Sequence, residues 1–188
     1  MTLDTIYNTL PTWAKDVKLN LQSALTGSST TELTSDQLWG SALAASMALR
    51  QPQLLAAIDA EAQANLSETN YNAAKTAASL MGMTNIYYRS LHHMSDKDYA
   101  TMPAGIRMNS MRSHGADHVD FDLWALAASV IGNCGGCINA HDKQAKDGGI
   151  SKGAIQSIIR LASVLHAAAV VLDTAAAETQ SDSTSQAA

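Results

Sequence analysis

Two cysteines, Cys134 and Cys137, lie three residues apart at the start of a predicted helix, and the 188-residue chain contains no other cysteine. Unpaired backbone N–H groups and the helix dipole at such a terminus favour the thiolate form of a sulfur placed there. The spacing of three residues brings the two sulfurs close together. In a reducing compartment a lone close pair is more typical of redox or metal chemistry than of a structural bridge. The pair therefore indicates thiol–disulfide chemistry.

His141 follows Cys137 by four residues, which is one helical turn, so its imidazole stands over the same helix face as that thiol. A neutral imidazole accepts a proton near physiological pH, and this makes Cys137 the better activated sulfur. The helix dipole alone favours the other sulfur, because Cys134 lies nearer the helix N-terminus. The order in which the two thiols act stays open at this point.

A general base needs an orienting partner, and Asp122 lies on the preceding predicted helix, twelve residues before Cys134. A hairpin between the two helices would return this carboxylate to the cysteine helix and form a relay of carboxylate, imidazole and thiol. An aspartate in the first turn of a helix is also a common capping residue, and Asp117 and Asp120 could serve in either role. Asp120 is displaced from Asp122 by roughly 200° around a helix, so it points elsewhere if Asp122 faces the cysteines.

Zinc binding and simple core packing are the alternatives for these residues. Cys134, Cys137 and His141 offer three zinc ligands, with Asp122 or water as a fourth. A structural zinc site normally takes two ligand pairs from separated segments, and this chain has only one pair. Two buried cysteines also behave as small apolar residues. Redox chemistry is the preferred interpretation, because the paired spacing occurs without any other cysteine.

Composition excludes several classes of protein. The chain is 46% hydrophobic, 15% charged and 5% aromatic, and its formal net charge is −5. These values describe one globular domain, and the excess of acidic residues argues against nucleic acid as a partner. No stretch approaches the roughly 20 consecutive apolar residues that a membrane span needs. Residues 1–11 lack the basic start of a secretory signal, so we expect a cytoplasmic protein.

Helix-forming residues dominate and strand-like alternation is nearly absent, so the sequence predicts that an all-α fold positions this site. Capping residues, together with glycines and prolines that end or begin helices, set the bounds of the expected helices. These helices cover residues 12–25, 35–47, 52–66, 67–81, 84–93, 103–108, 118–131, 134–148 and 151–177. The expected caps are Ser35 for the second helix, Asp117 for the helix that carries Asp122, and Asn133 for the cysteine helix. Residues 178–188 carry no apolar face, and we expect a disordered tail there beyond a single domain over 1–177.

An internal repeat relates the two halves of the chain. The segment 38–46 matches 123–129 once two residues are skipped, and the likeness continues beyond the first helix of each copy. This pattern predicts two repeated helical units that bury each other's apolar faces, with Trp39 and Trp124 in matching core positions. In the first copy, glutamine, leucine and isoleucine stand where the second has its two cysteines and its histidine. Only the second copy carries chemistry.

The segment Phe121-Asp122-Leu123-Trp124-Ala125, followed by Cys134-Gly-Gly-Cys137 and His141, resembles the alkyl hydroperoxidase D (AhpD) family. Three further segments share the resemblance, at 10–21, 81–89 and 105–109. The resemblance therefore covers nearly the whole chain except the tail. It implies an all-helical fold of the carboxymuconolactone decarboxylase type and a homotrimer.

By this resemblance the chain is an enzyme, an antioxidant thiol peroxidase that reduces organic hydroperoxides. Cys137 would attack the peroxide and become a sulfenic acid, and Cys134 would close the disulfide and face the reducing protein. His141 would activate Cys137, oriented by the acidic residue at the Asp122 position.

The resemblance also implies partners rather than a bound cofactor. A dihydrolipoyl group on a lipoyl-carrying E2 protein would return the disulfide to the dithiol, and dihydrolipoamide dehydrogenase would recharge that carrier. An AhpC-type peroxiredoxin would be a further partner, reduced by the dithiol. Two alternatives stay open, a general thiol–disulfide reductase without direct peroxidase activity and a zinc-binding scaffold protein.

Two positions depart from the family pattern. Asp122 stands where the family usually has glutamate, and the loss of one methylene leads us to expect a bridging water between this carboxylate and His141. Gly136 stands where many relatives place a histidine immediately before the second cysteine. The site then lacks one proton carrier, which predicts lower or differently tuned activity.

Overall fold

Helices account for the regular structure of the chain. The structure, a computed structural model, describes the backbone over residues 1–186 and the side chains over residues 1–178. The α-helices are α1 (Leu3–Thr9), α2 (Lys15–Leu25), α3 (Ser35–Leu49), α4 (Pro52–Asn65), α5 (Glu68–His93), α6 (His118–Ile131), α7 (Gly135–Asp147) and α8 (Lys152–Gln186), with short 3-10 turns η1 (Thr12–Ala14), η2 (Lys97–Thr101) and η3 (Asn109–Met111). No strand occurs in the described part, and the predicted all-α class is confirmed.

Side-chain caps explain where several helices begin. Thr34 and Gln37 form a reciprocal capping box before α3, so the cap is Thr34 and the expectation of Ser35 is wrong by one residue. Pro52 occupies the first turn of α4, where its missing N–H costs nothing. Asp117 accepts the backbone N–H groups of Val119 and Asp120 at the start of α6, as predicted.

Three expectations for the segments before α6 are corrected. A single helix, α5, covers the two helices expected over 67–93, because Gly82 continues the helix instead of breaking it. Residues 103–108 form no helix, and the only helical turn that follows them before α6 is η3. The helix expected over 12–25 begins instead as the 3-10 turn η1, which is followed by α2, and Trp13 in that turn is 60% exposed.

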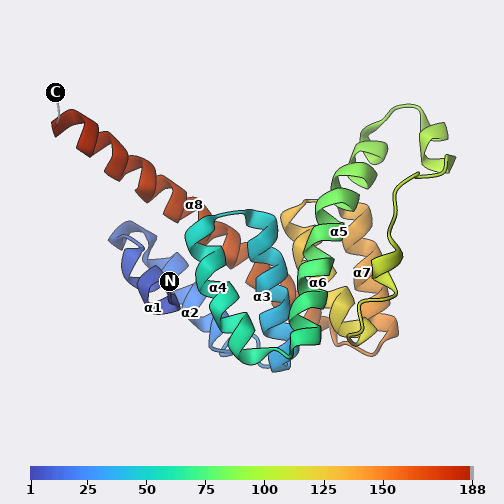
Figure 1. Cartoon of the computed structure of the whole chain (residues 1–188), viewed down its shortest axis with the longest axis horizontal. Helices are drawn as coiled ribbons and strands as arrows, with labels where there is room; N and C mark the ends of the chain where they lie inside the picture. Colours follow the sequence, from blue (N-terminus) through green and yellow to red (C-terminus); the bar gives the residue numbers. More distant parts are fainter. Residues whose placement is uncertain (187–188) are drawn as a thin grey trace.

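The centre of the fold is the contact between α3 and α6, the first helices of the two repeats (Figure 1). The indole of Trp124 is fully buried there, and its Nε1–H donates to the carbonyl oxygen of Asp36 over 3.1 Å. Gly40 of α3 faces this ring so closely that a Cβ would overlap it. Trp39 is also buried, as predicted. A helix-interior glycine, normally unfavourable, is thus required by the packing of the second tryptophan.

Helix α8 packs along the core and then leaves it. Its buried side chains end near Leu172, and Figure 1 shows the helix continuing away from the other helices. Contrary to the expectation from the sequence, the stretch Lys152–Glu178 is by length and composition apolar enough to cross a membrane. However, 56% of its 18-residue apolar window is buried inside the fold, as in the core helix of a globular protein. α8 extends past residue 177, where the sequence analysis ended it. The tail expected over 178–188 falls almost wholly outside the described side chains and stays a prediction.

Helices α5 and α7 flank α6 at one end of the molecule. The segment 94–117 leaves the end of α5 and returns to α6 along this same end (Figure 1). Contacts of η2 and η3 with α5 hold it there. The second repeat therefore presents its cysteine helix between α6 and a loop that the sequence analysis left without a role.

Candidate redox site

The turn between α6 and α7 places the two cysteines. Asn133 adopts a left-handed backbone with φ of 50°, and the next residue, Cys134, is the N-cap of α7. The sulfur of Cys134 accepts the backbone N–H of Cys137 over 3.3 Å. The expected cap at Asn133 is therefore wrong by one residue. The correction brings one sulfur directly onto the helix N-terminus, where N–H groups stabilise negative charge.

Cys134 and Cys137 are joined by a disulfide, with their Cα atoms 5.3 Å apart. The two residues are 1% and 7% exposed. The structure therefore shows the oxidised form of the pair, in which neither sulfur is a free thiol. Within the described residues, no group of three or more His, Cys, Asp or Glu side chains is arranged to hold a metal ion. The arrangement suits a two-electron exchange between a dithiol and a disulfide.

His141 and Asp122 meet across the α6–α7 hairpin. His141 is 5% exposed, and its Nδ1 lies 2.8 Å from Oδ1 of Asp122. A carboxylate accepts hydrogen bonds, so Nδ1 carries the proton and donates it. This contact is direct, and the bridging water expected for the shorter aspartate side chain is not needed. The hairpin brings together the imidazole and the carboxylate that the sequence analysis paired.

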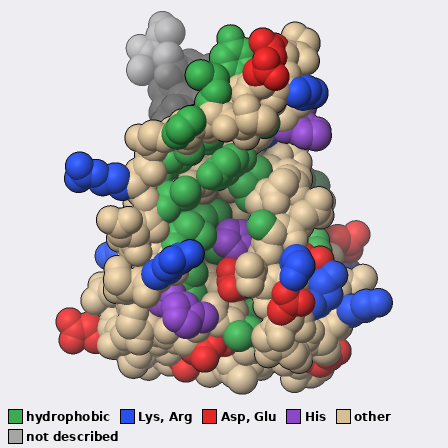
Figure 2. Space-filling model, turned by 90° about the vertical axis from the view of Figure 1, so that its right-hand side faces the viewer, with side chains coloured by type: hydrophobic (Ala, Val, Ile, Leu, Met, Phe, Trp, Pro, Cys, Tyr) green, Lys and Arg blue, Asp and Glu red, His purple; other side chains and the backbone are tan. Residues whose placement is uncertain are grey.

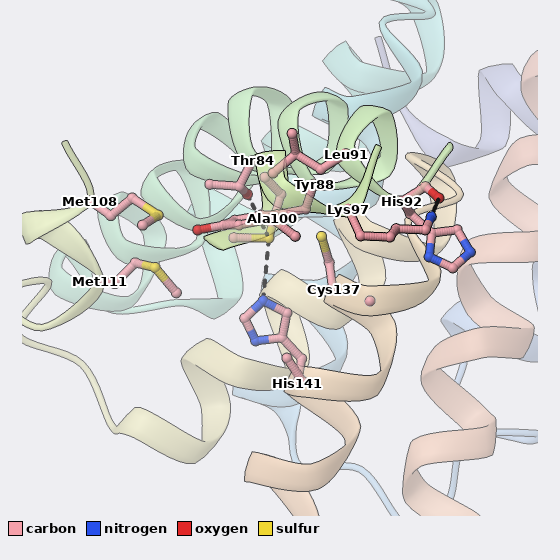
Figure 3. A pocket seen from close by; sticks show the side chains of 13 residues that line it. Thr84, Tyr88, Leu91, His92, Lys97, Ala100, Met108, Met111, Cys137 and His141 are labelled. Atoms are coloured by element: carbon pink, nitrogen blue, oxygen red, sulfur yellow. Dashed lines mark hydrogen bonds between the residues drawn. The ribbon is translucent and has the colours of Figure 1, made fainter. Parts of the chain in front are cut away.

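The other nitrogen of His141 meets a residue that the sequence analysis did not select. Nε2 lies 3.3 Å from the thioether sulfur of Met81 on α5, whereas no hydrogen bond joins this ring to Cys134 or Cys137 among the described residues (Figure 3). Met81 is separated from His141 by 60 positions in the chain, and a single methionine in an apolar helix carries no signal of such a contact. The catalytic role of His141 stays a prediction.

The three aspartates at the start of α6 have separate surroundings. Asp117 caps the helix, and Asp122 faces His141. Asp120 accepts a hydrogen bond from Nε2 of Gln37 over 2.9 Å, so it turns toward α3 and away from the cysteines. Burial raises the pKa of the Asp120 carboxyl, and the hydrogen bond from Gln37 partly offsets that shift. The angular argument that separated these residues agrees with their positions.

A cavity of about 770 Å³ opens beside the disulfide. Its lining residues come from α5, the segment after it, and α7: Met81, Thr84, Tyr88, Leu91, His92, Lys97, Ala100, Met108, Met111, Gly136, Cys137, Ala140 and His141. Figure 2 shows hydrophobic side chains gathered in a hollow of this face, with a histidine among them. Of the two cysteines, only Cys137 lines the cavity. The cavity therefore favours Cys137 as the sulfur that a ligand reaches, whereas the helix dipole alone favoured Cys134.

Lys97 lies at this cavity with its ammonium group held by the backbone. Its Nζ donates to the carbonyl oxygens of His92 and Met94, over 3.2 and 2.9 Å (Figure 3). These bonds tie η2 to the end of α5. The sequence predicted only a short helix over 103–108 in this region and gave no sign of the cavity wall that the residues after α5 form.

A second histidine, His114, lies near Asp122 in the loop before α6. The ring of His114 stacks on Phe121 with centroids 4.0 Å apart, and its Nδ1 accepts the backbone N–H of Ala116. Its buried Nε2 has no hydrogen-bond partner. Burial is the main cause that lowers the pKa of His114, and the neighbouring His118 adds to it. His114 lies in the loop before α6 and His118 is exposed at the start of that helix, so both agree with the surface or loop positions that their surroundings in the sequence predict.

The helical fold described here places a disulfide beside an apolar cavity and one helical turn from a hydrogen-bonded histidine. These features define a redox protein of the thiol–disulfide class. Residues 97–180 match the carboxymuconolactone decarboxylase family. The chain is 46% identical over 173 residues to alkyl hydroperoxide reductase AhpD of Acidobacterium capsulatum, covering 92% of this chain and 93% of that one. It therefore belongs to the alkyl hydroperoxide reductase AhpD family, and the resemblance noted in the sequence is confirmed.

Relatives from other bacteria agree over the same length. Alkyl hydroperoxide reductase AhpD of Streptomyces griseus is 43% identical over 173 residues, which are 92% of this chain and 96% of the relative. The protein of the same name from Maricaulis maris is 44% identical over 172 residues, which are 92% of this chain and 98% of the relative. In both comparisons the similarity therefore extends over almost the whole length of each chain.

Proposed function

We propose that this chain is an antioxidant thiol peroxidase that reduces organic hydroperoxides. The observation that carries the proposal is the position of Cys137, the one sulfur of the pair that lines the apolar cavity, four residues from a histidine bonded to a carboxylate. An apolar cavity favours an alkyl or aryl hydroperoxide over a small polar one, because burial of the organic group contributes binding energy. The names of the relatives support the same reaction.

The proposed cycle starts from the reduced dithiol. The thiolate of Cys137 attacks the terminal oxygen of the hydroperoxide, an S–O bond forms and the O–O bond breaks. The leaving alkoxide takes a proton and departs as the alcohol, while Cys137 becomes a sulfenic acid. Cys134 then attacks that sulfur and expels water, which restores the disulfide seen in the structure. Two thiols and one hydroperoxide thus become one disulfide, one alcohol and one water.

His141 is the proposed proton carrier of the first step. Its Nδ1 is held by Asp122, so its Nε2 is the nitrogen free to take the proton of Cys137 and to return it to the alkoxide. In the oxidised form Nε2 faces Met81 instead. Reduction frees the sulfur of Cys137 inside the same cavity, and we propose that the ring then serves this sulfur directly or through one water.

The remaining parts of the proposal concern partners and location. We propose that a dihydrolipoyl group on a carrier protein reduces the disulfide, that an AhpC-type peroxiredoxin is a further thiol partner, and that the enzyme works as a homotrimer in the cytoplasm. A dihydrolipoyl arm is a slender apolar dithiol, and the cavity beside Cys137 is wide and apolar enough to admit one. These points are supported by family membership, since no partner chain forms part of the structure.

A thiol count tests the proposed cycle. Anaerobically reduced protein is treated with one equivalent of cumene hydroperoxide and then with dihydrolipoamide. We expect both thiols to disappear within seconds and to return with the donor. Cys137→Ser should abolish peroxide consumption, whereas Cys134→Ser should still form a sulfenic acid in a single turnover, detected by mass spectrometry of a dimedone adduct. Full turnover in Cys137→Ser would show that the attacking sulfur is assigned wrongly.

One observation favours a second function, a thiol–disulfide reductase without direct peroxidase activity. In the oxidised form Nε2 of His141, the proposed proton acceptor, lies beside Met81, and among the described residues no hydrogen bond joins this ring to either cysteine. A reductase needs only thiol–disulfide exchange at this pair and does not need a base placed for attack on a peroxide. The two functions separate in the same experiment, because a reductase would recover its thiols with dihydrolipoamide after chemical oxidation but would not lose them to the hydroperoxide.

A further inference from the structure

Met81 places a third sulfur in the cavity, 3.3 Å from Nε2 of His141. The residue is 2% exposed in total, and the surface that it does show lines the cavity together with Cys137. The hydroxyl of Thr84 lies 3.6 Å from the same sulfur. A thioether that is closed to bulk water, open to the cavity and next to a proton-carrying ring is placed to react with whatever hydroperoxide enters.

We propose that Met81 is a second peroxide-reactive sulfur of this site, and that its oxidation to the sulfoxide by excess organic hydroperoxide withdraws His141 from proton transfer. The inference rests on the proposed function in one respect, because the hydroperoxide must enter the same cavity. It goes beyond that function by assigning a modification site and a self-limiting response to substrate excess.

The reaction needs no component besides the hydroperoxide. The thioether sulfur of Met81 attacks the terminal oxygen, an S–O bond forms and the O–O bond breaks. The proton of the terminal oxygen ends on the leaving alkoxide, which departs as the alcohol. The sulfur is oxidised by two electrons and the hydroperoxide is reduced by two. When His141 is protonated, its Nε2–H lies near enough to pass a proton to the alkoxide, which speeds the departure.

The state of the disulfide decides when this reaction competes. In the reduced enzyme the thiolate of Cys137 is the stronger nucleophile and consumes the hydroperoxide first. In the oxidised form Cys137 is bonded to Cys134 and cannot react. Met81 is then the reduced sulfur beside His141. Oxidation of Met81 is therefore expected when hydroperoxide arrives faster than the dithiol is regenerated.

The sulfoxide changes the hydrogen bonds of His141. A thioether is a weak acceptor, whereas the oxygen of a sulfoxide is polar and accepts well. Nε2 would then donate to this oxygen while Nδ1 donates to Asp122. With both nitrogens acting as donors, the ring holds its proton and no longer accepts that of Cys137. The loss of activity follows from the change in one acceptor atom.

Other methionines supply internal comparisons. Met83 lies two residues further along α5, is 37% exposed and does not line the cavity. Met108 and Met111 line the cavity but have no hydrogen bond to a histidine among the described contacts. If exposure alone governed oxidation, Met83 would react before Met81. If access to the cavity alone governed it, Met108 and Met111 would react as fast as Met81.

The test uses the full-length protein in its disulfide form. It is exposed to excess cumene hydroperoxide for increasing times, the peroxide is removed, and the disulfide is reduced. Peptide mass spectrometry then measures the sulfoxide at each methionine, and iodoacetamide measures the alkylation rate of Cys137. We expect sulfoxide at Met81 before Met83, Met108 and Met111, with Cys137 alkylation and peroxidase turnover lost in proportion to it.

Two variants isolate the sulfur. Met81→Leu keeps the side-chain volume, and each variant is compared with its own untreated sample. We expect Met81→Leu to keep its turnover after peroxide treatment and Met83→Leu to lose it as the wild type does. Earlier oxidation of Met83, or complete oxidation of Met81 with unchanged Cys137 alkylation, would overturn the proposal; the wild-type measurements decide this even if Met81→Leu does not fold. Sulfoxide at Met81 in a protein without hydroperoxide turnover would retain the modification site and reject the proposed function.

Discussion

The contact between Asp122 and His141 leads to the sharpest prediction about catalysis. Asp122→Asn keeps an oxygen that can accept the Nδ1–H of His141 over the same 2.8 Å but removes its negative charge. The imidazolium formed when His141 takes the proton of Cys137 then loses its charged partner. We expect the peroxide-reduction step to slow while the fold stays intact.

The size of the effect follows from the type of bond that is exchanged. A hydrogen bond to a charged group contributes about 1.5–3 kcal/mol and a neutral one about 0.5–1.5 kcal/mol, so the difference is about 1–1.5 kcal/mol. At about 1.36 kcal/mol for each factor of ten in rate, the step should slow roughly five- to twelvefold. The buried position of His141 keeps this contact from being screened by water.

The assay follows thiol loss in a single turnover, with prereduced enzyme and cumene hydroperoxide mixed in a quenched-flow instrument. Asp120→Asn is the matched control, because Asp120 lies two residues away on α6 and bonds Gln37 rather than His141. The control should react at the wild-type rate. Asp122→Glu tests whether the longer acidic residue usual in the family also serves His141.

An unchanged rate in Asp122→Asn would refute the reasoning, and so would an equal slowing in Asp120→Asn. The first result would mean that the Asp122–His141 contact only supports the fold. The second would mean that negative charge near the start of α6 matters more than the particular bond. Unfolding curves of both variants, measured alongside, show whether a fall in rate accompanies a loss of structure.

Three further predictions concern stability. Gly40→Ala should lower the free energy of unfolding by about 1–3 kcal/mol, because the new Cβ overlaps the indole of Trp124; thermal unfolding followed by tryptophan fluorescence measures this. Arg89→Met should cost about 1–3 kcal/mol in urea unfolding, because the guanidinium that donates to the carbonyl oxygen of Gly132 over 2.6 Å is lost from the turn before the cysteines. The pKa of His114 is lowered in the folded state, so below the ordinary value of 6.5 the unfolded chain binds more protons than the folded one. The free energy of unfolding therefore falls as the pH drops below 6.5. His114→Phe should show a smaller fall in Tm between neutral pH and about pH 5 than the wild type does. An unchanged pH dependence in that variant would contradict the assignment.

The helices and their caps show how far local rules extend. The starts of α4, α5 and α6 agree with the prediction, because a cap or a proline acts within one turn of the residue that carries it. The break expected between residues 81 and 84 is absent, since the single glycine there, Gly82, costs a helix only about 1 kcal/mol and the packing of α5 supplies more than that. The short helix expected at 103–108 failed for a related reason, because a proline permits a first turn but does not create one.

The sequence by itself determined those features of the site that lie within one helix. Cys134, Cys137 and His141 share one end of α7 because their spacings match the turn of a helix, and that geometry is the same in any fold. The pairing of Asp122 with His141 also followed from the sequence, since a short turn returns α6 beside α7.

Tertiary structure alone decided which face each helix presents to its neighbour. The packing of α5 against α7 brings Met81 to His141 from 60 positions away. The segment after α5 closes the cavity that Cys137 lines and Cys134 does not. Periodicity shows that a helix has an apolar face, but the partner of that face depends on how all the helices fill the common core. For this reason the sequence shows that the two sulfurs differ in their place on the helix, but only the folded molecule shows which of them faces the cavity.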